Sequence, residues 1–144
     1  MEKFDVVVIG SGPGGYVAAI RCAQLGMKTA IIERYSTLGG TCLNVGCIPS
    51  KALLDSSEHY HKAKEQFDDH GIELSNLQVN MKQMIKRKAE VVSQTVAGVD
   101  FLMKKNKIEV FHGHGSFKSD RVITITPDKG DSIDIEAAKT IIAT

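Results

Sequence analysis

A short apolar strand that ends abruptly in a cluster of glycines is the feature that most constrains this chain. Phe4 to Ile9 is an almost continuous apolar and β-branched run, as expected of a parallel strand buried on both faces. Glycines follow it at once, and from Pro13 to Leu25 apolar residues recur at helical spacing, with Gly26 placed to close the helix. Thr29 to Ile32 is a second apolar strand that ends at Glu33. These segments predict a βαβ unit and therefore a parallel sheet.

The glycine cluster itself predicts a dinucleotide site. Gly10, Gly12 and Gly15 match G-x-G-x-x-G between a strand and a helix, where backbone N–H groups can approach a pyrophosphate at the positive helix end. Glu33 follows at the distance where a carboxylate accepts hydrogen bonds from an adenosine ribose, and it would repel a ribose 2'-phosphate. The alternative is a turn that only packs a helix close to a sheet. The glycines alone do not decide between FAD and NAD.

Two closely spaced cysteines, Cys42 and Cys47, must either pair or share a ligand. In a regular helix their Cα atoms would lie roughly 8 to 9 Å apart, whereas a disulfide needs less than about 7 Å. A bridge therefore requires a distorted turn, for which Gly46 supplies backbone freedom, and distortion makes the bond easier to reduce. A zinc site is the alternative. It needs four ligands, and a strand face shared by His112 and His114 is the place where more could be found.

Composition narrows the classes of function. The 144 residues are 42% hydrophobic with a net charge of +1, which is ordinary for a soluble globular domain and gives no case for nucleic-acid binding or a membrane span. The first residues lack the apolar region of a secretory signal, so we expect a cytoplasmic protein. There a close cysteine pair is catalytic or metal-binding more often than structural. Cys22, on the first helix among apolar neighbours, is expected to be an inert core thiol.

The rest of the chain predicts two further helices and a set of strands. One helix runs from Ser50 to about Phe67 with Leu53 and Leu54 toward the core, and a longer one follows the N-cap Asn80. The longer helix carries an apolar stripe that is expected to be core: Met81, Met84, Ile85, Val92, Val96, Val99, Leu102 and Met103. From Ile108 to Ile135 period-two segments predict a small antiparallel meander, followed by a last strand at 140–144 that could return to the first sheet. The predicted fold class is α/β, a Rossmann-like domain with a central parallel sheet, flanking helices and a small meander.

The order of glycine turn, ribose acid and cysteine motif resembles the pyridine nucleotide disulfide oxidoreductases. Residues 39–51, with the sequence GGTCLNVGCIPSK, are similar to the redox-centre signature of that family throughout, and the resemblance covers the whole chain. It implies FAD along the glycine turn, with the flavin beside the cysteine pair and Lys51 near the flavin. Because a zinc site needs four ligands, a redox pair is preferred and no metal is expected. The cofactor-binding residues that it implies are Gly10, Gly12, Pro13, Gly14, Gly15, Glu33, Arg34, Gly39, Gly40, Thr41, Cys42, Cys47, Lys51, Gly115, Ala143 and Thr144.

The resemblance also implies roles and partners. Cys42 would be the interchange thiol that meets the substrate and Cys47 the flavin-side sulfur, in members that oxidise dihydrolipoamide with NAD as the final acceptor. Such members work as homodimers with lipoyl-bearing subunits of 2-oxoacid dehydrogenase or glycine cleavage complexes. Family members continue with nicotinamide, central and interface domains, so residues 1–144 are expected to be an incomplete FAD-binding domain that is inactive alone. Members that reduce mercuric ion or glutathione disulfide share the cysteine spacing, and a non-catalytic dinucleotide-binding module is the remaining alternative.

Overall fold

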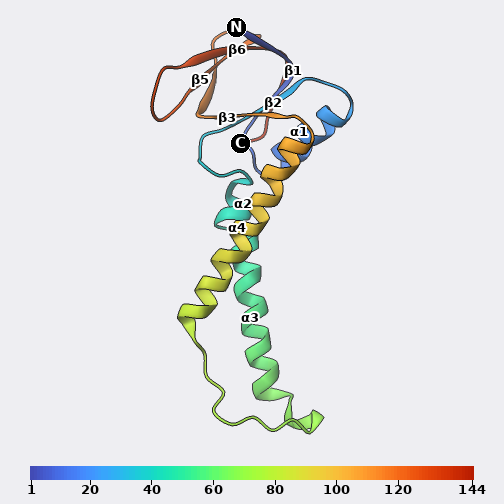
Figure 1. Cartoon of the computed structure of the whole chain (residues 1–144), viewed down its shortest axis with the longest axis vertical. Helices are drawn as coiled ribbons and strands as arrows, with labels where there is room; N and C mark the ends of the chain where they lie inside the picture. The colour runs from blue at the N-terminus through green and yellow to red at the C-terminus, as the bar shows by residue number, and fades with distance from the viewer.

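One six-stranded sheet organises the molecule. The computed structural model describes residues 1–144 and orders the strands β3-β2-β1-β6-β5-β4. Helices lie against one face, and a long helical hairpin extends away from the sheet (Figure 1). The predicted α/β class, with a parallel sheet and an antiparallel part, is confirmed.

The parallel half of the sheet follows the prediction closely. Strand β1 (Glu2–Ile9) pairs in parallel with β2 (Thr29–Glu33), and helix α1 (Pro13–Gln24) connects them. The helix ends where Gly26 takes a positive φ of 85° and its N–H bonds to the carbonyl of Ala23, as expected of a helix-closing glycine. The first βαβ unit is therefore built as its sequence indicates.

The antiparallel half differs from the prediction in two respects. Strand β3 (Glu109–His112) does not belong to a meander, because it pairs in parallel with β2 at the sheet edge. Strands β4 (His114–Phe117) and β5 (Val122–Thr126) do pair antiparallel, and β5 pairs with β6 (Ile133–Ile142). The last strand is not separate from the meander: β6 is one continuous strand that also pairs in parallel with β1. A single long strand thus serves both halves, which period-two patterning cannot reveal.

Two apolar layers cover the two faces of the sheet. Side chains alternate between faces along a strand, so Val6 and Val8 point to one layer, and Val7 and Ile9 to the other. The first layer includes buried residues of helices α1 and α4, and the second includes the β5 and β6 residues Ile123, Ile125 and Ile135. Burial on both faces explains why β1 is apolar without alternation.

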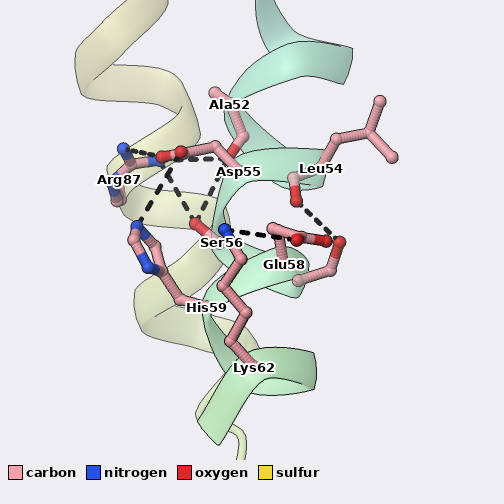
Figure 2. A network of polar contacts seen from close by, with 9 residues as sticks. Ala52, Leu54, Asp55, Ser56, Glu58, His59, Lys62 and Arg87 are labelled. Atoms are coloured by element: carbon pink, nitrogen blue, oxygen red, sulfur yellow. Dashed lines mark hydrogen bonds and ion pairs between the residues drawn. The ribbon is translucent and has the colours of Figure 1, made fainter. Parts of the chain in front are cut away.

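The helical hairpin is formed by α3 (Cys47–Glu65) and α4 (Met81–Lys105), with the short 3₁₀ turn η1 (Asp68–His70) near its far end (Figure 1). The cap prediction is confirmed, since the N–H of Gln83 donates to Asn80 Oδ1 at 3.0 Å. Only part of the predicted stripe is core: Val96, Val99 and Met103 are buried. Met81 and Ile85 are exposed because the first part of α4 extends away from the sheet (Figure 1), and Leu54 is exposed because its side chain points away from α4 (Figure 2).

A polar network fastens the two helices of this hairpin (Figure 2). Arg87 of α4 donates from Nη1 to the carbonyl of Ala52 at 3.0 Å and to the hydroxyl of Ser56 at 3.2 Å, and from Nη2 to Asp55 at 2.7 Å. Asp55 also lies 3.8 Å from Nε2 of His59. The Arg87 contacts fix the position of α3 along α4. Because α3 begins at Cys47, they also help to position that cysteine.

Candidate functional site

The glycine turn fits tightly between β1, α1 and the end of β6. Gly10 has a φ of +97°, and a Cβ there would lie 2.5 Å from the carbonyl oxygen of Ala143. A Cβ on Gly15 would lie 1.9 Å from the carbonyl oxygen of Gly10, whereas Gly12 and Gly14 have open space around them. Gly10 and Gly15 therefore close the turn, and Gly12 and Gly14 leave the start of α1 accessible. No side chain caps that helix, so an anion can accept from its first N–H groups.

Glu33 lies at the end of β2 and is an ionised, buried carboxylate. Its Oε2 accepts from the N–H of Ser11 at 3.0 Å and from the Ser11 hydroxyl at 2.5 Å, and its Oε1 accepts from the N–H of Tyr35 at 3.0 Å. Burial acts to raise its pKa, but the hydrogen bonds from Ser11, Tyr35 and the Arg34 backbone outweigh burial and lower the pKa below 4.5. A negative charge therefore stands beside the glycine turn at neutral pH.

The two cysteines lie on either side of a break between two helices. Cys42 is in α2 (Gly40–Asn44), and Cys47 is the first residue of α3. At the break, a Cβ on Gly46 would lie 3.0 Å from the carbonyl oxygen of Thr41 and 3.4 Å from Cα of Cys42. Glycine is needed there for this close approach, and the approach brings Cys47 back beside Cys42. The distorted turn predicted from the spacing is present.

The two thiols interact, and both are free in this structure. The pKa of the Cys42 thiol is raised, first by its side-chain hydrogen bond with Cys47 and then by partial burial and the charge of Cys47. The positive charge of Lys51 acts in the opposite direction. The hydrogen bond with Cys47 and the partial burial of Cys42 therefore favour the protonated form of the Cys42 thiol.

A cavity of about 830 Å³ joins the glycine turn to the cysteine pair. This volume is within the usual range for small-molecule and cofactor sites, roughly 300 to 1,000 Å³. Most of the predicted site residues line the cavity: Gly10, Gly12, Pro13, Gly14, Glu33, Arg34, Gly40, Thr41, Cys42, Cys47, Gly115, Ala143 and Thr144. Three of them do not, because Gly15 and Gly39 are buried in packing contacts and Lys51 is exposed on α3.

Sequence reasoning missed several lining residues: Ile9, Ser11, Ile32, Tyr35, Gly46, Gly113 and His114. Tyr35 could have been found from its position directly after Glu33 and Arg34. Gly113 and His114 could not, because they follow β3 and reach the cavity through its unpredicted parallel pairing with β2, where the N–H of Gly113 donates to the carbonyl of Glu33 at 2.9 Å. Gly115 shows how this happens, since a Cβ there would lie 3.2 Å from Cδ1 of Ile32, at the end of β2.

Three residues that could carry chemistry lie apart from this site: Cys22 on α1, and His59 and His61 on α3. Cys22 is half-buried against the helix-side layer. His59 and His61 are exposed on α3. No cluster of three or more His, Cys, Asp or Glu side chains is positioned to hold a metal ion. The helices include none that combines the length and the apolar character needed to cross a membrane.

A dinucleotide-type glycine turn that shares one cavity with a dithiol defines a dinucleotide-dependent disulfide oxidoreductase site. Comparison with known proteins agrees with this class. The model of the pyridine nucleotide-disulphide oxidoreductase family matches residues 4–144, and the chain belongs to that family.

Curated relatives are similar over nearly the whole chain. It is 50% identical over 143 residues to a mitochondrial dihydrolipoyl dehydrogenase of Pisum sativum, covering 99% of this chain and 28% of the relative. It is 51% identical over 143 residues to a leghemoglobin reductase of Vigna unguiculata, covering 99% of this chain and 27% of that protein. The chain thus spans little more than a quarter of the length of these relatives.

A solved structure shares the fold. A Cu(II) complex of the HOCl-induced flavoprotein disulfide reductase RclA from Escherichia coli matches with a TM-score of 0.78 and 28% identity, covering 100% of this chain and 29% of that one. The family and this flavoprotein neighbour imply FAD as the cofactor. The open space at Gly12 and Gly14, the uncapped start of α1 and the ionised Glu33 suit the phosphates and ribose of such a cofactor.

The comparisons contradict the cytoplasmic location predicted from the sequence. The similar dihydrolipoyl dehydrogenases of Pisum sativum, Arabidopsis thaliana and Schizosaccharomyces pombe are named as mitochondrial. The prediction was wrong because it rested on the lack of a secretory signal, and that observation excludes only the secretory route.

Proposed function

We propose that this chain is the FAD-binding, dithiol-bearing domain of a dihydrolipoyl dehydrogenase. The observation that carries the proposal is the single cavity in which the glycine turn, Glu33 and the Cys42–Cys47 pair meet. Identity of about half over 143 residues to proteins of that name supports it. The proposal includes residues 1–144 as one domain of a longer homodimeric enzyme, with NAD as the final electron acceptor.

The proposed chemistry is thiol–disulfide exchange between a dithiol substrate and the cysteine pair. One substrate thiolate attacks Sγ of Cys42 in the Cys42–Cys47 disulfide, forms a mixed disulfide and displaces Cys47 as thiolate. The second substrate thiol, as it loses its proton, attacks the substrate sulfur of that mixed disulfide and releases the Cys42 sulfur, which takes up a proton. Two electrons pass to the cysteines, and the substrate leaves as a cyclic disulfide. The raised pKa of Cys42 supports this order, because a thiol with a raised pKa readily takes up a proton when its sulfur is released.

The protein groups around the cavity would bind and orient the cofactor. The first turn of α1 would hold the pyrophosphate, Glu33 would accept from the adenosine ribose, and Gly115 would let the backbone approach the adenine. Bound FAD supplies a two-electron acceptor for the dithiol. Lys51 would keep a positive charge near the pair, in line with its influence on Cys42.

A thiol-mapping experiment tests the proposed exchange. In air-oxidised protein, alkylation followed by peptide mass spectrometry should find Cys42 and Cys47 protected and linked to each other. Dihydrolipoamide should free both, and it should do so faster than glutathione at equal thiol concentration because its second thiol reacts intramolecularly. The matched control is Cys22→Ser, which lies outside the cavity and should leave both rates unchanged. Cys42 and Cys47 both free in air, or preference for glutathione, would refute the proposal.

A second variant tests the assigned polarity of the pair. In reduced, FAD-loaded protein, Cys47→Ser should abolish any long-wavelength absorbance that arises from a thiolate beside the flavin. Cys42→Ser should retain it. The opposite pattern would exchange the two roles.

The source of the substrate dithiol is the remaining part of the proposal. The names of the relatives favour lipoyl-bearing subunits of 2-oxoacid dehydrogenase or glycine cleavage complexes as partners. The two leghemoglobin reductases among the relatives make haem-protein reduction the second candidate. Side-by-side assays of the longer protein with dihydrolipoamide and with an oxidised haem protein would separate these two functions.

A further inference from the structure

A buried chain of hydrogen bonds joins Glu33 to the start of the helix that carries Cys42. The N–H of Gly39 donates to Ser11 Oγ at 3.2 Å, and the Ser11 hydroxyl donates to Glu33 Oε2 at 2.5 Å. Ser11 is fully buried and Glu33 is 6% exposed. Because Glu33 lies on β2 and Gly39 is the N-cap of α2, one side chain bridges two separate elements of the site.

The donor and acceptor in each of these hydrogen bonds are fixed by chemistry. An ionised carboxylate only accepts hydrogen bonds, so the Ser11 proton must point to Glu33. The lone pairs of the Ser11 oxygen then face the N–H of Gly39, which also donates to the Ser11 carbonyl at 3.0 Å. If Glu33 is protonated, the reason for the orientation of the Ser11 hydroxyl is lost.

The carboxylate is also close to its capacity as an acceptor. It offers about four acceptor positions. The N–H and hydroxyl of Ser11 and the N–H of Tyr35 fill three of them, and the backbone N–H of Arg34 interacts with the carboxylate as well. Oε2 already holds two donors. A ribose hydroxyl that binds Oε2 must displace the Ser11 hydroxyl, and one that binds Oε1 must share that oxygen with Tyr35.

We propose that Ser11 is a positioning residue that transmits the state of the Glu33 carboxylate to Gly39 and so to the helix of Cys42. The states are the free carboxylate, the protonated acid and the carboxylate bound to a ribose hydroxyl. The last of these rests on the proposed function, and the first two do not. Ser11 thus couples occupation of the adenosine end of the cavity to the placement of the substrate-side cysteine.

The experiment is an acid titration of the nucleotide-free 144-residue chain, followed by NMR at three backbone amides. In the wild type, the amides of residue 11, Tyr35 and Gly39 should all report the Glu33 titration. In Ser11→Ala, the amides of residue 11 and Tyr35 should still report it, because their bonds to Glu33 persist. The Gly39 amide should lose most of its shift, although its bond to the carbonyl of residue 11 remains.

Controls separate this coupling from a general loss of structure. Thr29→Val removes another buried hydroxyl, which donates to the carbonyl of Met27 at 3.0 Å, and it should leave the Gly39 response intact. His112, whose Nδ1 lies 2.8 Å from the Tyr35 carbonyl, is followed through its own ring signals. Arg34, the charged neighbour of Glu33, stays protonated throughout. An unchanged Gly39 response in Ser11→Ala would overturn the proposal.

A second arm uses ADP as the probe. In the wild type, ADP should shift the Gly39 and Cys42 amides, and in Ser11→Ala it should still shift Tyr35 while these two responses are lost. Equal responses of Gly39 and Cys42 in both proteins would mean that ADP acts on α2 directly and would overturn the proposal. If ADP fails to bind the wild type, the proposed nucleotide site fails, and the acid titration still decides the role of Ser11.

Discussion

Two polar clusters with similar hydrogen-bond lengths stabilise different parts of this molecule. Their exposure to solvent determines how much each contributes to the free energy of unfolding. The turn cluster, formed by Ser11, Glu33, Tyr35 and Gly39, centres on a carboxylate that is 6% exposed. The hairpin cluster joins Arg87 to Ala52, Asp55 and Ser56, and its charged side chains are 44% and 53% exposed. Water replaces the partners of the second cluster more readily than those of the first, so deletion should cost more in the turn cluster.

The largest expected effect is that of Glu33→Ala. The change leaves the N–H and hydroxyl of Ser11 and the N–H of Tyr35 without their acceptor. Each unsatisfied buried donor costs about 1 to 3 kcal/mol, and the two Ser11 donors are buried, so we expect the free energy of unfolding to fall by about 2 kcal/mol or more. Urea unfolding of the wild type and of Glu33→Ala at neutral pH measures this loss of free energy. A loss below about 1 kcal/mol would show that solvent reaches this cluster.

The next effect is a pH dependence that belongs to the turn cluster. The folded pKa of Glu33 is below its ordinary value of 4.5, so its contribution to stability is present above pH 4.5 and is lost as the pH falls through the folded pKa. Glu33→Gln should therefore flatten the decline in unfolding free energy below pH 4.5 relative to the wild type. Urea unfolding at a series of acidic pH values checks this, and parallel curves for the two proteins would contradict it.

The smallest effect is expected for Arg87→Ala in the hairpin cluster. Exposed ion pairs contribute about 0.2 to 1 kcal/mol, and added salt screens part of it. We expect a loss within that range that shrinks at high salt, measured by urea unfolding at two salt concentrations. Arg87→Lys is the matched control, because it keeps the charge but not the forked donation to Ala52 and Asp55. A loss as large as that of Glu33→Ala would erase the contrast between the two clusters.

Patterns local in sequence predicted most of the parallel half and of the site. The run from Phe4 to Glu33 determines its own structure, because buried strands, a glycine turn and an amphipathic helix each have a distinct local pattern. The start of α3 was placed at Ser50 rather than Cys47, since nothing in the residue types indicates that the cysteine itself begins the helix. Exposure of Met81 and Ile85 depends on where the sheet ends, which periodicity does not contain.

The parts that escaped prediction depend on contacts between distant residues. The parallel pairing of β3 with β2 and the double role of β6 are choices among strands of similar composition. Ser11 occupies a position that the G-x-G-x-x-G pattern leaves open, and its partner Glu33 is 22 residues away. Its role follows only when the two side chains are seen in contact.

The most direct test of the central claim is calorimetric titration of the purified 144-residue chain with FAD. We expect one equivalent to bind and ADP to compete for the adenosine end of the cavity. Glu33→Gln should weaken both, because it removes the charge that accepts from the ribose. A chain that is folded by circular dichroism yet binds neither FAD nor ADP would contradict the claim that this cavity is a cofactor site.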